Sequence, residues 1–147
     1  WTHADMQTDP ADFLTAIEYC QNSKNPGPHF VKGLRYGRPL TDQIFTVGMS
    51  LFETVLLMTS LRDINAQPTV FPRTFFTSWE NPPKDFSLDL FAYYQAKRQS
   101  LKVYRFPVLF SARSYGVSHW NIDWRSKVKF IQRTVSYSLS LRAALRK

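Results

Sequence analysis

Residues 43–61, QIFTVGMSLFETVLLMTSL, are 19 consecutive residues with a single charged side chain, Glu53. Eleven of these positions are apolar, and the stretch is bounded by Asp42 and Arg62. An α-helix of this length extends roughly 28 Å, close to the hydrocarbon thickness of a bilayer. The Ile, Leu, Phe and Val residues favour insertion, whereas Glu53 and the small polar residues oppose it by a similar free energy. The stretch therefore predicts a transmembrane helix that is stable only beside partner helices.

The polar residues of this stretch recur at helical spacing. Thr46, Ser50 and Glu53 lie four and three residues apart, and Ser60 follows seven residues later. On a helix they form one stripe, in which Thr46 and Ser50 allow a neighbouring helix to approach closely. A Glu within a membrane needs a partner, so we predict that this interhelical polar stripe contacts other membrane subunits. The alternative is an amphipathic helix of a soluble core, with the same stripe facing solvent.

The chain as a whole predicts a mainly α fold. Pro10 and Asp12 favour a short N-terminal helix, and the polar, proline-containing segment after it ends that helix. We expect four regions: an N-terminal helix with a basic linker, the transmembrane helix, a Pro/aromatic-rich linker, and a basic helical C-terminal region. Their boundaries are 1–41, 42–62, 63–86 and 87–147.

Proline governs the predictions for the middle of the chain. Residues 63–86 contain four prolines and predict an extended strap. Its aromatic side chains either bind a partner or a membrane interface, or pack onto the core of this chain. Residues 87–99 predict a helix, and residues 103–110 a β-like run that Pro107 restricts to a sheet edge or an extended strap. The strap aromatics are Phe71, Phe75, Phe76 and Trp79.

The last segment, about 121–147, predicts a basic amphipathic helix. Trp124 begins an apolar stripe that continues through four aliphatic residues, and a polar, basic stripe runs beside it. A basic face beside an apolar stripe fits an anionic lipid such as cardiolipin, or RNA. A helix whose polar face is merely solvated is the alternative. The predicted lipid or polyanion contacts are Trp124, Arg125, Lys129 and Arg133.

Composition limits the classes of function. The 147 residues carry a net charge of +8, and their 12 Phe, 7 Tyr and 4 Trp supply enough apolar area for a packed core. Cys20 has no partner for a disulfide, and the sequence contains no nucleotide-binding, metalloprotease, CxxC or GxSxG motif. The three histidines lie far apart at positions 3, 29 and 119. We therefore predict no catalytic residues, no metal site and no cofactor.

Several features together predict a mitochondrial protein. The sequence contains a lone thiol, no Asn-x-Ser/Thr glycosylation site and no hydrophobic signal peptide, and it is basic. It begins Trp-Thr-His without an initiator Met, which a removed targeting segment explains, as do an incomplete sequence record and trimming during purification. We expect the mitochondrial inner membrane.

In architecture, one short span, aromatic straps and a basic surface helix, the chain resembles the supernumerary subunits of respiratory complexes and of the ATP synthase membrane region. The resemblance implies a noncatalytic accessory subunit that contributes to assembly and stability, with other subunits as its partners. A mitochondrial ribosomal protein that contacts rRNA through its basic half is the second interpretation. The third is a small soluble α+β domain that binds a ligand among its aromatic residues.

Overall fold

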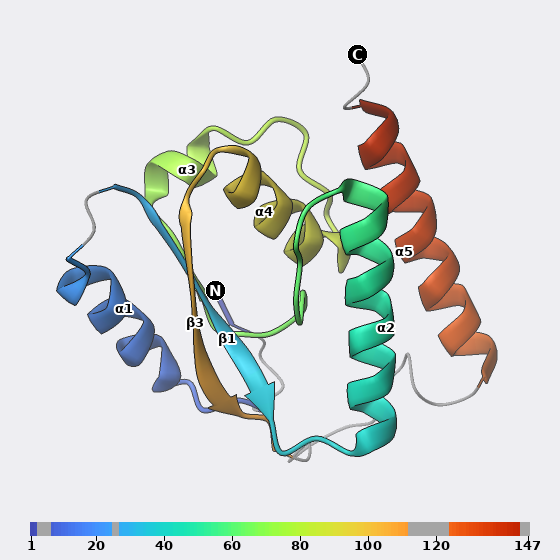
Figure 1. The fold of residues 1–147 in the computed structure, drawn as a ribbon, viewed down its shortest axis with the longest axis horizontal. Helices are drawn as coiled ribbons and strands as arrows, with labels where there is room; N and C mark the ends of the chain where they lie inside the picture. The colour runs from blue at the N-terminus through green and yellow to red at the C-terminus, as the bar shows by residue number, and fades with distance from the viewer. Residues whose placement is uncertain (3–6, 25–26, 112–123, 145–147) are drawn as a thin grey trace.

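The computed structural model describes residues 1–2, 7–24, 27–111 and 124–144. Across these residues the fold is α+β, with five helices and a three-stranded mixed sheet, so the prediction of a mainly α fold was incomplete (Figure 1). The elements are α1 Asp12–Asn22, β1 His29–Tyr36, α2 Leu40–Leu57, β2 Thr69–Val70, α3 Arg73–Thr77, α4 Ser87–Arg98, β3 Lys102–Leu109 and α5 Trp124–Ala144.

The sheet has the strand order β2-β1-β3, with β1 antiparallel to β2 and parallel to β3. The sequence prediction missed β1, because its basic residues indicated a solvated linker. The structure instead buries Phe30, Val31 and Lys32 completely, since the central strand is covered on both faces. Phe30 packs in a cluster with α4, and Val31 packs in a second cluster with Ala16 of α1. Side chains alternate across a strand, so α1 and α4 cover opposite faces of the sheet.

β3 is an edge strand, as Pro107 predicts. Lys102 N–H donates to Pro28 O and Phe110 N–H donates to Tyr36 O, so the even-numbered amides of this strand point toward β1. The nitrogen of Pro107 therefore points away from β1, where the missing N–H costs no hydrogen bond within the sheet. The same missing donor makes this edge a poor template for a further strand.

The Pro/aromatic-rich segment packs onto the core of its own chain. Phe71 stacks on Phe30 at a ring-centroid distance of 5.7 Å, and Phe75 and Trp79 meet edge-on at 5.4 Å. Phe75 is buried, whereas Phe76 is exposed. The prediction that these aromatic side chains pack onto the core of their own chain is therefore correct for all but the exposed Phe76. The segment contains β2 and α3 as well as extended chain.

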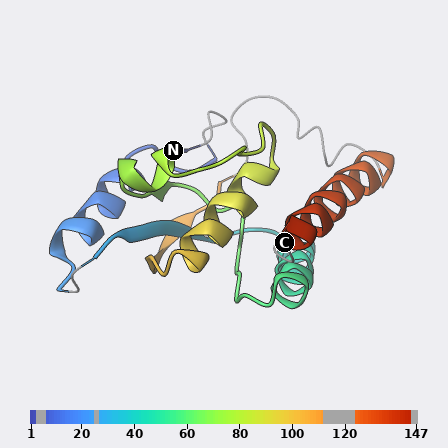
Figure 2. The ribbon, with the colours of Figure 1, turned by 90° about the horizontal axis from the view of Figure 1, so that it is seen from above.

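α4 confirms the helix predicted at 87–99, and it is buried on most of its circumference because the sheet and the 71–79 segment enclose it. Outside the sheet, α2 and α5 lie side by side (Figures 1 and 2). They run parallel, because Glu53 meets Ser138 and, further along both helices, Leu56 meets Arg142. The helix expected at 43–61 runs from Leu40 to Leu57, and Met58 ends it in the left-handed conformation at a φ of 51°.

The basic C-terminal helix is confirmed over Trp124–Ala144. Residues 121–123 and 145–147 of the predicted helix lie outside the described residues.

Candidate functional site: the inner and outer faces of helix α2

The polar stripe of α2 faces the interior of its own chain. Thr46 Oγ1 accepts a hydrogen bond of 2.8 Å from the Arg38 guanidinium, and Ser50 Oγ accepts one of 3.1 Å from Asp63 N–H. Glu53 is only 1% exposed. Ser60 lies beyond the C-terminal end of α2 and is exposed. Three of the four predicted stripe residues therefore lie on one inward face, which excludes the alternative of a solvent-facing stripe.

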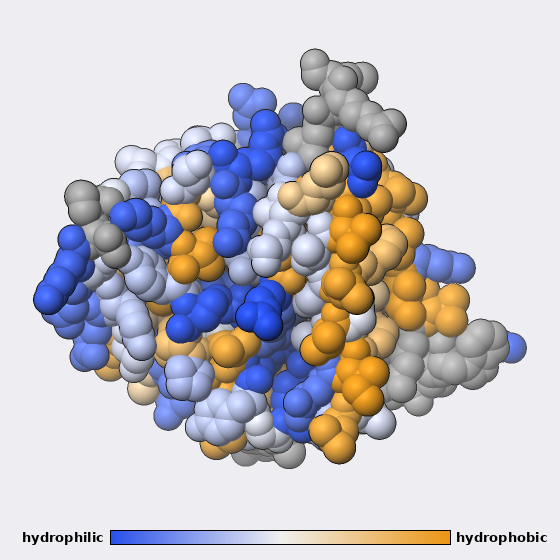
Figure 3. All heavy atoms as spheres, viewed as in Figure 1, coloured by the Kyte–Doolittle hydropathy of each residue, from blue (hydrophilic) through white to orange (hydrophobic). Residues whose placement is uncertain are grey.

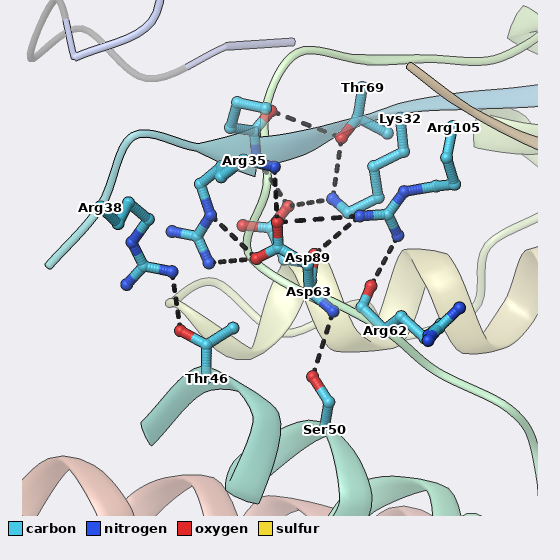
Figure 4. Close-up of polar contacts among 11 residues, drawn as sticks. Lys32, Arg35, Arg38, Thr46, Ser50, Arg62, Asp63, Thr69, Asp89 and Arg105 are labelled. Atoms are coloured by element: carbon cyan, nitrogen blue, oxygen red, sulfur yellow. Dashed lines mark hydrogen bonds and ion pairs between the residues drawn. The ribbon is translucent and has the colours of Figure 1, made fainter. Parts of the chain in front are cut away.

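A charged cluster lies against the middle of α2 at Ser50 (Figure 4). Asp63 binds the Arg35 guanidinium and the Arg35 backbone N–H, and Arg105 lies 3.9 Å from its second oxygen. Burial would raise the pKa of Asp63, but the hydrogen bonds and charge of Arg35, helped by Arg105, lower it below the usual value. Asp63 therefore stays ionised and ties β1, β3 and the segment after α2 together.

A second buried charge pair crosses from β1 to α4. Lys32 Nζ lies 3.4 Å from Asp89 Oδ1 and donates to Thr69 Oγ1 at 3.0 Å, and Gln67 Nε2 donates to Asp89 Oδ1 at 2.7 Å. Burial lowers the pKa of Lys32 to about 8, although Asp89 opposes the shift. Because every member has a polar partner, this network is compatible with a fully buried position.

Glu53 forms the polar contact between α2 and α5. Its Oε1 lies 2.7 Å from Ser138 Oγ, which also lies 2.8 Å from the Thr134 carbonyl oxygen. Ser138 Oγ–H donates to Glu53 Oε1, and the same hydroxyl hydrogen is shared with the Thr134 carbonyl oxygen. Burial raises the pKa of Glu53 to about 7, and the Ser138 hydrogen bond opposes the shift. Burial therefore outweighs the hydrogen bond from Ser138 and favours the neutral acid.

Glu53 also lines a pocket between α2, α5 and the segments that precede β2 and α4. The pocket has a volume of about 60 Å³, which is room for a few water molecules or one small group. Glu53 Oε2 is buried and has no hydrogen-bond partner among the residues that the structure describes. Most of the surface that lines the pocket is apolar. Besides Glu53, the lining residues are Arg35, Phe45, Thr46, Met49, Ser50, Ile64, Asn65, Phe86, Ser87, Leu90, Phe130 and Thr134.

The outer face of α2 is an exposed apolar stripe that recurs at helical spacing along the whole helix (Figure 3). Each side chain is at least 63% exposed, and α2 passes the length and composition criteria for a membrane span. Two residues of the predicted apolar stripe of α5, Val128 and Leu139, are also exposed. The stripe, called the α2 outer face below, consists of Leu40, Ile44, Val47, Leu51, Val55 and Met58.

The basic residues predicted on the C-terminal helix lie on its exposed side. Arg125 and Lys129 are exposed, and Arg133 is half-exposed, 3.6 Å from Asp85 and over the ring of Phe86. The side chain of Trp124 lies outside the described part of the structure.

Sequence reasoning missed Arg35, Asp63 and Ser138, the residues that fix the inner face of α2. Arg35 and Asp63 were counted only as charges, and Ser138 falls between the two stripes assigned to the C-terminal helix. Both contacts join residues that are distant in the sequence: Asp63 is 28 residues from Arg35, and Ser138 is 85 residues from Glu53. Among the described residues, no three His, Cys, Asp or Glu side chains gather as a metal site would require.

No protein-family model matches the chain, and neither a curated protein nor a solved structure matches it.

Proposed function

We propose that this protein is a noncatalytic accessory subunit of a mitochondrial inner-membrane complex of oxidative phosphorylation. The observation that supports it is the reversed amphipathicity of α2. A helix on the surface of a soluble domain turns its apolar stripe inward and its polar stripe outward. α2 does the opposite, because its polar stripe binds its own chain and its apolar stripe is exposed. Such a face needs an apolar neighbour.

In this proposal α2 docks sideways rather than crossing the bilayer as a free span. The chain after α2 turns back along the helix: Leu61 N–H donates to Thr54 Oγ1, and Asp63 N–H to Ser50 Oγ. The ion pair of Asp63 with Arg35 therefore lies beside the helix midpoint. A crossing would carry that cluster into the hydrocarbon, where charged groups are costly. The α2 outer face is therefore assigned to a hydrophobic surface of a neighbouring subunit.

Anionic lipid is a second partner in this proposal. Arg125 and Lys129 are exposed on α5, the helix that packs against α2. Basic residues near a membrane surface attract anionic headgroups by about 1 kcal/mol each. Cardiolipin fits this basic side of α5 better than a neutral lipid does.

Two other interpretations remain as outcomes of the test. The ribosomal interpretation uses the same basic residues for rRNA, but it leaves the α2 outer face unexplained. The soluble ligand-binding interpretation agrees with the α+β fold and with the Glu53 pocket, and it also leaves that face uncovered.

The test compares two single substitutions in the full chain, expressed in mitochondria. Leu51→Asp places a charge on the α2 outer face, and Leu14→Asp places the same charge on α1, where Leu14 is 54% exposed. Both variants should fold with free energies of unfolding close to wild type, because exposed substitutions cost little. Only Leu51→Asp should lose its place in a large complex on a native gel.

The contradicting outcomes are equally direct. Normal assembly of Leu51→Asp shows that the α2 outer face is no subunit contact. Sedimentation that collapses after RNase treatment favours the ribosomal interpretation, and a wild-type chain that migrates alone favours the soluble domain.

A further inference from the structure

The pocket between α2 and α5 holds a chemical feature that an accessory role does not use. Glu53 is almost completely buried and lines the pocket, and its Oε2 has no hydrogen-bond partner within the described part of the chain. A buried acceptor without a hydrogen bond is destabilising, because it loses its hydration without gaining a partner. Oε1 is already engaged with Ser138, so any compensation must come from a group inside the pocket.

The lining determines which group fits. Hydrogen bonds with an ionised donor or acceptor are about twice as strong as those between neutral groups, and an ammonium ion also balances the charge of a carboxylate. The rings of Phe45, Phe86 and Phe130 line the same pocket, and aromatic rings attract cations. Arg35 is the only charged side chain besides Glu53 among the described lining residues, and Asp63 already pairs with it. From α5, Arg142 binds the Leu56 carbonyl oxygen rather than Glu53.

We propose that this pocket binds a primary ammonium group carried on a short apolar body. The ammonium donates to Glu53 Oε2, and the hydroxyl oxygens of Ser50 and Thr134 line the pocket as further acceptors. The apolar body lies among the phenylalanine side chains and Met49 and Leu90. This site is independent of the α2 outer face, so it stands or falls separately from the proposed function.

Binding exchanges a proton for the ligand. Below about pH 7, burial keeps Glu53 of the empty pocket mainly in its neutral, protonated form. When R–NH₃⁺ enters, the Glu53 carboxyl releases its proton to solvent, and Ser138 Oγ–H continues to donate to Glu53 Oε1. The charge of the carboxylate then balances the charge of the ammonium. Since the pKa of Glu53 is about 7, ligand affinity should fall about tenfold between pH 8 and pH 6.

The experiment is calorimetric titration of the full chain with n-butylammonium chloride at pH 8, with n-butanol as the neutral analogue of equal length. Glu53→Gln keeps the size and removes the charge, and Glu80→Gln makes the same change at an exposed position. We expect binding of the ammonium to wild type and Glu80→Gln, at least tenfold weaker binding to Glu53→Gln, and weaker binding of butanol. Equal affinity of the two ligands, or of the two variants, overturns the proposal.

A second measurement covers the case in which Glu53→Gln does not fold. Titration of wild type at pH 6 in buffers of different ionisation enthalpy should show release of about one proton per ammonium bound. Binding without proton release overturns the assignment to Glu53. Vesicles of phosphatidylethanolamine, against phosphatidylcholine vesicles whose headgroup has no N–H, then identify the source. Selective binding to the former indicates a lipid headgroup, and binding of the soluble amine alone indicates a free metabolite.

Discussion

Glu53 should make the protein less stable as pH rises through the neutral range. Its pKa is about 7 in the folded chain against an ordinary value of 4.5. Between these values the folded state binds more protons than the unfolded state, so the free energy of unfolding decreases with increasing pH. The penalty is absent below about pH 4.5 and complete above about pH 7. At 1.36 kcal/mol per pKa unit it reaches about 3 kcal/mol.

Glu53→Gln isolates this effect, because Gln does not titrate and can still contact Ser138. Urea unfolding of both proteins at pH 5, 6, 7 and 8 gives the difference between their free energies at each pH. All other titrating groups are common to both chains and cancel. We expect the variant to gain on wild type by about 3 kcal/mol between pH 4.5 and pH 7, and by little above it. Parallel pH profiles would mean that the pKa of Glu53 is the same in the folded and the unfolded chain, and the effect assigned to burial would be wrong.

Three further substitutions test the packing around the site. Gly33→Ala should lower the free energy of unfolding by about 3 kcal/mol in urea titrations, because the new Cβ would meet the Gln67 backbone and Val108. Gly48→Ala is the matched control, because its new Cβ meets nothing within 4 Å. It should raise the free energy of unfolding by about 1 kcal/mol, since Ala favours a helix more than Gly does. Equal effects at the two glycines would contradict the packing described. Lys32→Met should lower the free energy of unfolding by about 3–5 kcal/mol, because it leaves Asp89 buried without Lys32 as its cation. Adding Asp89→Asn should recover at least half of that loss. Additive losses in the double variant would show that the two residues are not coupled. Ser138→Ala should cost about 1 kcal/mol and leave Thr134 O with one hydrogen bond fewer, and an unchanged free energy of unfolding would mean that the α2–α5 contact does not depend on this hydroxyl.

The sequence by itself determined the elements whose signals are local. Local signals, such as Pro10 and Asp12 at a helix start and apolar residues at helical spacing, located α1, α4 and α5 within a few residues. Pro107 restricted the run around it to a sheet edge or an extended strap, because a missing N–H acts at its own position, and the structure shows the sheet edge. The spacing of Thr46, Ser50 and Glu53 also determined that α2 has one polar and one apolar stripe.

Only the tertiary structure decided which stripe of α2 faces inward and that residues 29–36 form a central strand. The sequence around Lys32 indicates only a basic linker, and the fold buries Lys32 beside Asp89, which is 57 residues later in the chain. The sequence predicts that Glu53 contacts another subunit, whereas in the structure Glu53 contacts Ser138 of its own chain. Both outcomes depend on groups that are distant in sequence, and helical or strand periodicity carries no information about such partners. Periodicity defines the faces of an element, whereas the long-range polar contacts determine which face is buried.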